Sequence, residues 1–295
     1  MDNENTPYPK QDTVWWKELW LTRLAKNPMT VRHRHTVQEK ANKWNKRAEW
    51  FSKQISGHEG NERTQFVMNF LEQENALPKP GERVLDIGAG TGAFTIPFLK
   101  CGVEVVALEP AEAMIDIIRK NCDEASVPHP TFLQKTWQDI DLDTEGMRGA
   151  FDLAFASMTP GVRDPDTLDK LNAASRGHCY FSAFSGQRWR DQYGEIWQKI
   201  FNEELSGMAP DVSLAFQYLY AGGYRPSMTF RGTTRKMEQE PGEVVESMLL
   251  FLDDYTEINA HVREYVESFT REHTTDGLFK LATKSCQGMM LWSVV

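Results

Sequence analysis

The chain has 295 residues, and its 40% hydrophobic and 11% aromatic residues exclude global disorder and suit one α/β domain with additions. A formal net charge of −9 disfavours nucleic acid and anionic lipid as bulk partners. The four cysteines lack metal-ligand spacing, no apolar run is long enough to span a membrane, and the start shows no signal peptide, so we expect a reduced cytoplasmic protein without a metal.

Three helical patterns occupy the first part of the chain. Residues 13–27 carry tryptophans and leucines at helical spacing until Pro28 ends the pattern. Residues 37–51 and 61–75 repeat this spacing, and Pro78 and Pro80 then interrupt the chain. We therefore predict an N-terminal helical cap over residues 1–75.

A regular alternation of strands and helices follows. The strand patterns fall at residues 83–86, 103–108, 131–134, 151–156 and 178–184, and the helical patterns at 92–100, 111–122 and 168–175. Strands joined by helices through short links form a parallel sheet with helices on both faces. We assign this α/β core to residues 76–186.

The pattern changes after the core. Helical patterns occupy 189–205, 212–220, 243–254 and 256–273, whereas 227–237 alternates like a strand. We predict a mostly helical lid over residues 187–275 with one core strand near 227–237. Residues 276–295 supply final strands, with Gly288 as a turn or bulge, that complete a Rossmann-like, mostly parallel sheet of seven strands.

The run Val84 to Phe94 is the strongest local signal. A buried strand ends in Asp86, glycines alternate with small residues, and a helix begins at once. Such a turn lets the backbone approach a ligand closely. Glu109 ends the next strand about twenty residues later, where a carboxylate can accept ribose hydroxyl protons.

This turn alone leaves two ligands open. Gly88-x-Gly90-x-x-Ala93 satisfies the dinucleotide pattern of NAD(P)-dependent oxidoreductases, although no P-loop lysine follows. Asp86 stands where a pyrophosphate would be repelled and a cation accepted, which favours S-adenosylmethionine.

VLDIGAGTGAFTIPFL, VVALEPAEAMI and FDLAFASMTP closely resemble motif I, the acidic post-I motif and the fourth-strand motif of class I S-adenosylmethionine-dependent methyltransferases. WNKRAEWFSKQI, from residue 44, is similar to the N-terminal helix that closes over the cofactor in many small-molecule members. The Asn-Pro-Pro-Tyr signature of nucleic-acid and protein amide methylases is absent from the fourth-strand motif.

The resemblance implies the cofactor contacts. The glycine turn would line the methionine and ribose through Asp86, Gly88, Ala89, Gly90, Thr91 and Gly92. Glu109 would hold the ribose hydroxyls, and the adenine would lie among Pro110, Met114, Trp137, Gln138 and Asp139. Trp137 stands where members usually carry an aspartate. Ser157 and Met158 would flank the sulfonium.

These motifs predict a small-molecule methyltransferase that works by in-line transfer of the cofactor's methyl group. Aromatic side chains are candidates for binding the acceptor, namely Trp44, Trp189, Trp197 and Tyr220. No residue stands out as a general base. We expect no nucleic-acid or membrane partner, and a monomer or homodimer. The alternatives are an oxidoreductase, or a methyltransferase-fold protein that uses the site for another reaction, such as dehalogenation, or for binding only.

Overall fold

The computed structural model describes residues 11–35, 39, 43–45, 48–49, 52, 57–186, 191–205 and 211–295. The helices are α1 (Thr13–Lys26), α2 (Pro28–Val31), α4 (His58–Gln73), α5 (Thr95–Lys100), α6 (Glu112–Ala125), α7 (Pro165–Ala174), α8 (Asp191–Phe201), α9 (Val212–Ala221), α10 (Pro241–Leu252) and α11 (Ala260–Glu272). The strands are β1 (Arg83–Ile87), β2 (Glu104–Leu108), β3 (Thr131–Leu133), β4 (Phe151–Ser157), β5 (Ser175–Phe184), β6 (Ser227–Gln239), β7 (Thr274–Thr275) and β8 (Leu278–Ser293).

One sheet organises these elements, in the order β3-β2-β1-β4-β5-β8-β6, with the short β7 beside β8. Strands β1 to β5 pair in parallel, whereas β8 runs antiparallel to both β5 and β6. This arrangement confirms the predicted α/β class and the mostly parallel, Rossmann-like sheet of seven principal strands. Among the described helices, none is both long and apolar enough to cross a bilayer.

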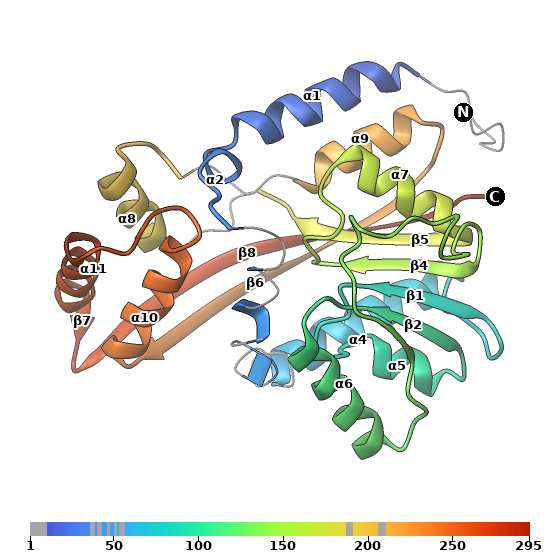
Figure 1. The fold of residues 1–295 in the computed structure, drawn as a ribbon, viewed down its shortest axis with the longest axis horizontal. Helices are drawn as coiled ribbons and strands as arrows, with labels where there is room; N and C mark the ends of the chain where they lie inside the picture. The colour runs from blue at the N-terminus through green and yellow to red at the C-terminus, as the bar shows by residue number, and fades with distance from the viewer. Residues whose placement is uncertain are drawn as a thin grey trace.

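Helices cover both faces of the sheet (Figure 1). Apolar residues of α1, α7 and α9 pack on one face, and those of α4, α5 and α6 pack on the other. Two predicted placements therefore differ from the structure. The N-terminal helices do not form one cap, because α1 and α4 lie on opposite faces. Helix α9 belongs to the core layer and not to the lid, because its residues pack with Trp20 and Leu168 against the sheet.

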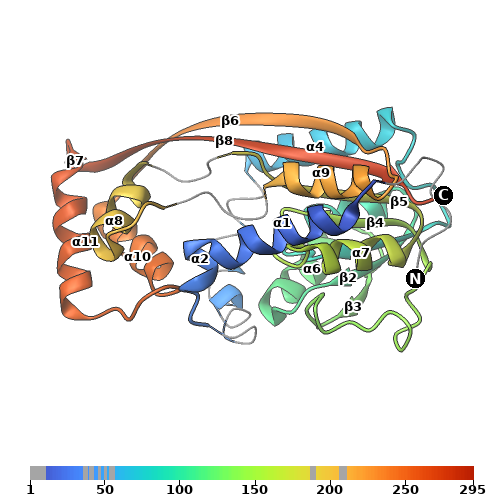
Figure 2. The same cartoon turned by 90° about the horizontal axis from the view of Figure 1, so that it is seen from above.

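Strands β6 and β8 extend beyond the rest of the sheet. Their pairing continues from Ser227 opposite Leu291 to Gln239 opposite Phe279, whereas β5 reaches no further along β8 than Gln287. The unaccompanied half forms a two-stranded arm, and α8, α10 and α11 gather at its far end (Figure 2). These helices share a separate apolar core, which also includes Phe279 of the arm. The lid is thus anchored by the same strands that complete the sheet.

Gly288 lies inside the continuous strand β8, so the prediction of a turn or bulge at this residue is wrong. A Cβ atom at Gly288 would come within 2.5 Å of Val212 Cγ1 at the start of α9. The residue is glycine because a helix packs directly on the strand there, not because the chain bends.

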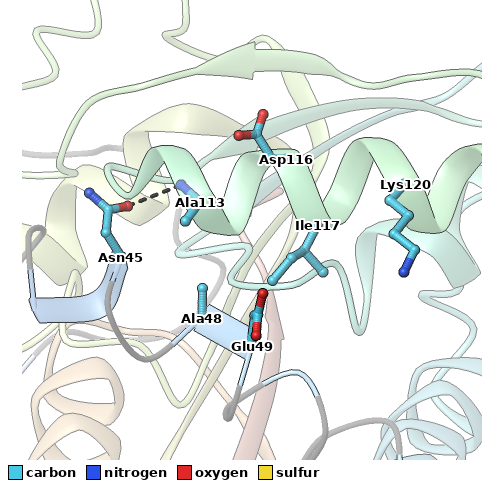
Figure 3. Close-up of a pocket in the computed structure, with 7 residues that line it drawn as sticks. All are labelled: Asn45, Ala48, Glu49, Ala113, Asp116, Ile117 and Lys120. Carbon is cyan, nitrogen blue, oxygen red and sulfur yellow. Dashed lines mark hydrogen bonds between the residues drawn. The ribbon is translucent and has the colours of Figure 1, made fainter.

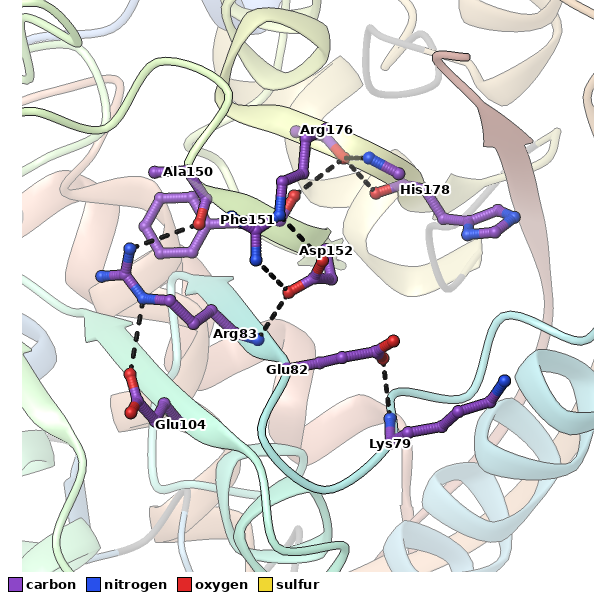
Figure 4. Close-up of polar contacts among 11 residues, drawn as sticks. Lys79, Glu82, Arg83, Glu104, Ala150, Phe151, Asp152, Arg176 and His178 are labelled. Atoms are coloured by element: carbon purple, nitrogen blue, oxygen red, sulfur yellow. Dashed lines mark hydrogen bonds and ion pairs between the residues drawn. The ribbon is translucent and has the colours of Figure 1, made fainter.

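An ionic network joins the amino-terminal ends of the strands, on the edge opposite the glycine turn (Figure 4). Asp152 accepts hydrogen bonds from the backbone N–H of Arg83 at 2.8 Å and, through both oxygens, from the guanidinium of Arg176 at 2.8 Å. The Arg176 guanidinium is the main reason that the pKa of Asp152 is lowered. Arg83 also faces Glu104 at 3.5 Å, so β1, β2, β4 and β5 are linked where they begin.

We predict that Gly288→Ala destabilises the protein by about 1–3 kcal/mol, because the new methyl group overlaps Val212 and forces α9 away from the sheet. Gly232→Ala is the matched control. It lies in the neighbouring strand β6, where a Cβ atom meets nothing within 4 Å. Urea unfolding of both variants measures the difference, and equal stabilities would contradict the packing explanation.

Candidate functional site

The order of the strands reverses beside β1, which lies between β2 and β4. In an open α/β sheet a ligand binds at such a switch point, beyond the carboxyl ends of the strands. The chain leaves these ends at Ile87, Leu108 and Ser157. The residues that follow are the glycine turn, Glu109 and Met158, so the fold brings three of the predicted motifs to one edge.

The glycine turn has a backbone shape that depends on its glycines. Gly88, Gly90 and Gly92 have φ angles of 70°, 57° and 86°, a region that side chains with a Cβ atom rarely adopt. A Cβ atom at Gly88 would also lie 2.2 Å from Thr159 Oγ1 after β4. The turn is anchored to β2, because the N–H groups of Gly88 and Ala89 donate to the Leu108 carbonyl at 2.8 and 3.2 Å.

Glu109 joins the turn to the next helix. One carboxylate oxygen accepts the Gly90 N–H at 2.9 Å, and the other accepts the Ala111 N–H at 3.0 Å, directly before α6. The side chain is only 6% exposed, and this burial raises the pKa of Glu109 against the opposing effect of the two hydrogen bonds. Each oxygen retains a second lone pair, so the same carboxylate can still accept hydrogen bonds from two ligand hydroxyls.

Asp86 is the second buried acid, at 2% exposure below the turn. Its Oδ2 accepts a hydrogen bond from Thr95 Oγ1 at 2.6 Å. Burial, which outweighs this hydrogen bond, raises the pKa of Asp86 to about 7, and the negative charge of Glu109 contributes in the same direction. Asp86 and Glu109 are thus two neighbouring buried carboxylates whose hydrogen-bond donors among the described residues are neutral, and such a pair is suited to a cationic ligand.

The remaining predicted cofactor residues are dispersed around this edge. The Thr91 carbonyl accepts the Asn121 side-chain amide at 2.9 Å, and Pro110 lies half-buried after Glu109. Ser157 Oγ lies 3.2 Å from Ser182 Oγ. Met158 takes a left-handed φ of 54°, and its N–H donates to the Ser182 carbonyl at 3.0 Å.

The three residues predicted at the adenine after β3 separate into two environments. Gln138 and Asp139 are exposed, and the Gln138 side-chain amide donates to the Gly161 carbonyl at 2.9 Å. The Trp137 ring is buried in the core, where its indole N–H donates to the Thr167 carbonyl at 3.1 Å. The Trp137 ring is therefore not exposed at the predicted adenine position in this structure, because its packing against α7 holds it inside.

The structure places two of the aromatic residues predicted for the acceptor, Trp197 and Tyr220, in different layers. Trp197 is completely buried in the lid core and Tyr220 lies on α9, where Phe216 stacks on it and Arg225 lies 4.1 Å from its ring centre. These positions contradict a shared acceptor pocket for the two, since α9 belongs to the sheet layer. Trp189 lies outside the described residues. Trp44 packs against the cluster of Ala48, Ala111 and Met114 at the start of α6.

Asn45 is a residue whose contribution the sequence did not reveal. Helix α6 is preceded by Ala111, which has no side-chain oxygen to cap it, and Asn45 Oδ1 accepts the Ala113 N–H at 3.0 Å instead. Two residues earlier, Lys43 contacts Asp253 at 2.6 Å and Asp254 at 2.7 Å, both at the end of α10. One short segment thus connects the lid to the helix that Glu109 holds.

A pocket lies beside this capping contact, on the outer side of α6 (Figure 3). Its lining combines small and charged side chains, namely Asn45, Ala48, Glu49, Ala113, Asp116, Ile117 and Lys120. It lies apart from the glycine turn, which is on the sheet side of α6. We therefore place the functional site at the switch point and not in this pocket.

Comparisons with known proteins support this placement. Residues 84–176 match a family model described as "Methyltransferase domain". The match confirms the predicted methyltransferase resemblance of the core, whose Rossmann-like fold follows from the order of the strands. It covers the glycine turn, Glu109 and the end of β4, and it extends to the start of β5.

An uncharacterized protein of Haemophilus influenzae is 25% identical over 208 residues, which are 70% of this chain and 72% of that protein. An uncharacterized methyltransferase of Mycobacterium tuberculosis is 40% identical over 67 residues, which are 23% of this chain and 26% of that protein's length. Among solved structures, a putative methyltransferase from Bacillus halodurans has a TM-score of 0.49 at 13% identity, covering 77% of this chain and 98% of that one.

The buried state of Asp86 predicts a pH-dependent stability. Its folded pKa of about 7 lies above the ordinary value of 3.8, so the folded protein binds the extra proton between these values. Stability of the ligand-free protein should therefore fall as pH rises from about 4 to 7, by about 2–4 kcal/mol for a shift of this size. Asp86→Asn should remove most of this fall, with Glu109 retaining a share. Urea unfolding at pH 5 and pH 7.5 measures the slope.

Asp276→Asn is the control, because this acid is exposed on the turn before β8. It should keep the slope of the natural protein. A slope that is unchanged in Asp86→Asn would contradict the assignment of the buried proton.

Proposed function

We propose that this protein is a methyltransferase that transfers the methyl group of S-adenosylmethionine to a small-molecule acceptor by in-line displacement. The observation that carries the proposal is the pair of buried acids, Asp86 and Glu109, on either side of the glycine turn. A dinucleotide would bring a pyrophosphate to this turn, and the buried carboxylate of Asp86 would repel it. S-adenosylmethionine brings a sulfonium and an ammonium group and no phosphate.

The residues of the site have distinct roles in the proposed function. The backbone of Gly88 to Gly92 approaches the ligand closely, and Glu109 accepts the two ribose hydroxyls with the lone pairs that its backbone contacts leave available. Asp86 compensates the positive charge of the methionine part. Met114 in the first turn of α6 and Pro110 just before this helix would receive the adenine, and Ser157 and Met158 at the end of β4 would lie near the reacting sulfur.

The bound cofactor supplies an activated methyl group, so the protein mainly provides alignment and a site that excludes water. The conformation of Met158 serves this alignment, because its left-handed φ of 54° turns the chain at the end of β4. A general base is needed only for an acceptor that must lose a proton. No general base is part of this proposal.

A small-molecule acceptor is supported by the charge of the chain and by the lid. The net charge of −9 disfavours a polyanion such as RNA as the acceptor. The lid is carried on the β6–β8 arm, and Lys43 ties it to the segment that caps α6. Such a lid can enclose an acceptor of limited size over the edge of the sheet.

Isothermal titration with S-adenosylhomocysteine and with NADH tests the cofactor class. We expect binding of S-adenosylhomocysteine and none of NADH, and the reverse result would favour an oxidoreductase. Formation of S-adenosylhomocysteine from S-adenosylmethionine with pooled metabolites, and separately with total RNA, then tests the acceptor. Turnover with RNA alone would refute the small-molecule acceptor, and binding without turnover in any pool would favour a binding protein or another reaction.

We predict that Glu109→Gln weakens S-adenosylhomocysteine binding at least about tenfold, because the amide offers one acceptor oxygen where the carboxylate offers two.

Binding of S-adenosylmethionine to the natural protein should tighten as pH rises from 6 to 8, because the cation favours ionised Asp86 and a proton is released. Titration calorimetry in buffers of different ionisation enthalpy measures both effects. In Asp86→Asn the tightening should shrink; an identical pH profile would contradict the role of Asp86.

A further inference from the structure

A line of polar side chains leads away from the end of β4 across the neighbouring strands. Ser157 Oγ lies 3.2 Å from Ser182 Oγ on β5, and the buried Gln287 side-chain amide on β8 donates to Ser182 Oγ at 3.1 Å. Gln287 is paired with Arg231 on β6, whose guanidinium lies 3.4 Å from Glu62 on α4. We call these five residues the polar track.

The track begins where the reacting sulfur would lie and ends beneath α4. Its members come from β4, β5, β8, β6 and α4, so only the assembled sheet brings them together. Ser182 and Gln287 are buried, and the Arg231 side chain is 16% exposed. Burial of this many polar groups in one line is costly unless they have partners. Ser182 and Gln287 meet this need by bonding to each other, and the partly buried Ser157, at the carboxyl edge, is the member that a polar ligand can contact.

Tyr180 supplies a second, independent observation. Its ring is completely buried and stacks on Phe155 with centres 4.4 Å apart. Its hydroxyl is buried and has no hydrogen-bond partner among the described residues. Burial raises the pKa of the Tyr180 hydroxyl, and the nearby Ser182, Arg63 and Ser157 side chains oppose this rise. Tyr180 precedes Ser182 by two residues on β5, so both side chains lie on the face of the sheet that carries the track.

Two arginines and one acid lie at the far end of the track. Arg231 on β6 faces Glu62, and Arg63 on the same helix lies with its guanidinium carbon 5.4 Å from the centre of the Phe94 ring. A partly buried guanidinium is well suited to a carboxylate or a phosphate, which it can bind through two parallel hydrogen bonds. The contact between Arg231 and Glu62 is longer than a strong charged hydrogen bond, so a ligand anion can compete for it.

From this arrangement we propose that the acceptor carries an anionic group, a carboxylate or a phosphate, which Arg231 binds. The opposite end of the acceptor, with the atom that receives the methyl group, lies toward Ser157 and the Tyr180 hydroxyl. Gln287 and Ser182 lie between Arg231 and Ser157 in the sheet. The proposal rests on the proposed methyltransferase function and adds the chemical class of the acceptor.

Two of the predicted aromatic residues lie away from the track. Trp197 is enclosed by the lid core, and Tyr220 lies on α9, on the other face of the sheet from Tyr180. The side of the sheet that carries the track is the same side on which α5 follows the glycine turn. Acceptor and cofactor would therefore meet on one face.

Thermal unfolding of the protein saturated with S-adenosylhomocysteine tests the proposal. Sodium phosphate and sodium acetate are each compared with sodium chloride at equal ionic strength. We expect at least one of the two anions to raise Tm by about 2 °C or more at ten times its Kd. A shift with phosphate alone indicates a phosphorylated acceptor, and a shift with acetate indicates a carboxylate.

Arg231→Gln should abolish this shift and leave the affinity for S-adenosylhomocysteine unchanged. Arg263→Gln is the matched control, because Arg263 contacts Glu246 at 3.0 Å on the outside of the lid. It should keep the shift, and this comparison removes the general stabilisation that phosphate gives to many proteins. No anion-specific shift in the natural protein, or an equal shift in Arg231→Gln, would overturn the proposal.

Tyr180→Phe tests the second observation separately. Because it removes a buried hydroxyl without a partner, the ligand-free variant should be at least as stable as the natural protein. Marked destabilisation would show that the hydroxyl serves the core and would remove it from the acceptor site. Failure of S-adenosylhomocysteine to bind the natural protein would refute the proposed function itself, whereas normal binding without an anion effect refutes this inference alone.

Discussion

The geometry of the proposed cofactor site depends on two hydrogen bonds that the Glu109 carboxylate accepts. The Gly90 N–H donates to one carboxylate oxygen and the Ala111 N–H to the other, so a single side chain holds both the turn after β1 and the start of α6. The glycine turn has little side-chain packing of its own and takes its shape from such anchors. The arrangement of the glycine turn and the start of α6 therefore depends on a buried carboxylate that can still accept further hydrogen bonds.

A second constraint comes from the N-terminal segment that contains Lys43 and Asn45. Helix α6 lacks a cap from its own sequence neighbours, and Asn45 supplies the missing acceptor. Lys43 binds the two aspartates that end α10. The predicted lid, the N-terminal segment and Glu109 are thus connected through consecutive contacts, which relates the position of the lid to the region where we propose that the cofactor binds.

Local patterns were sufficient for the sheet and for the cofactor motifs. Apolar strands alternating with helices predict a parallel sheet, and the carboxyl ends of such strands meet at one edge, which is why Asp86, Glu109 and Ser157 lie at the same edge. Side-chain direction was less predictable. Trp137 follows β3 as expected, yet its ring turns into the core because Thr167 offers a carbonyl to its indole N–H. Gly288 has the composition of a turn but serves close packing with Val212.

The sequence by itself determined the α/β class, the glycine turn with its two acids and the methyltransferase resemblance, because these depend on residues close together in the chain. The tertiary structure decided which faces α1, α4 and α9 cover and where the β6–β8 arm carries the lid. It also aligned Ser157, Ser182, Gln287 and Arg231 across four strands. Such contacts join residues far apart in sequence, and helical or strand periodicity shows which side of an element is apolar but not which partner will cover it.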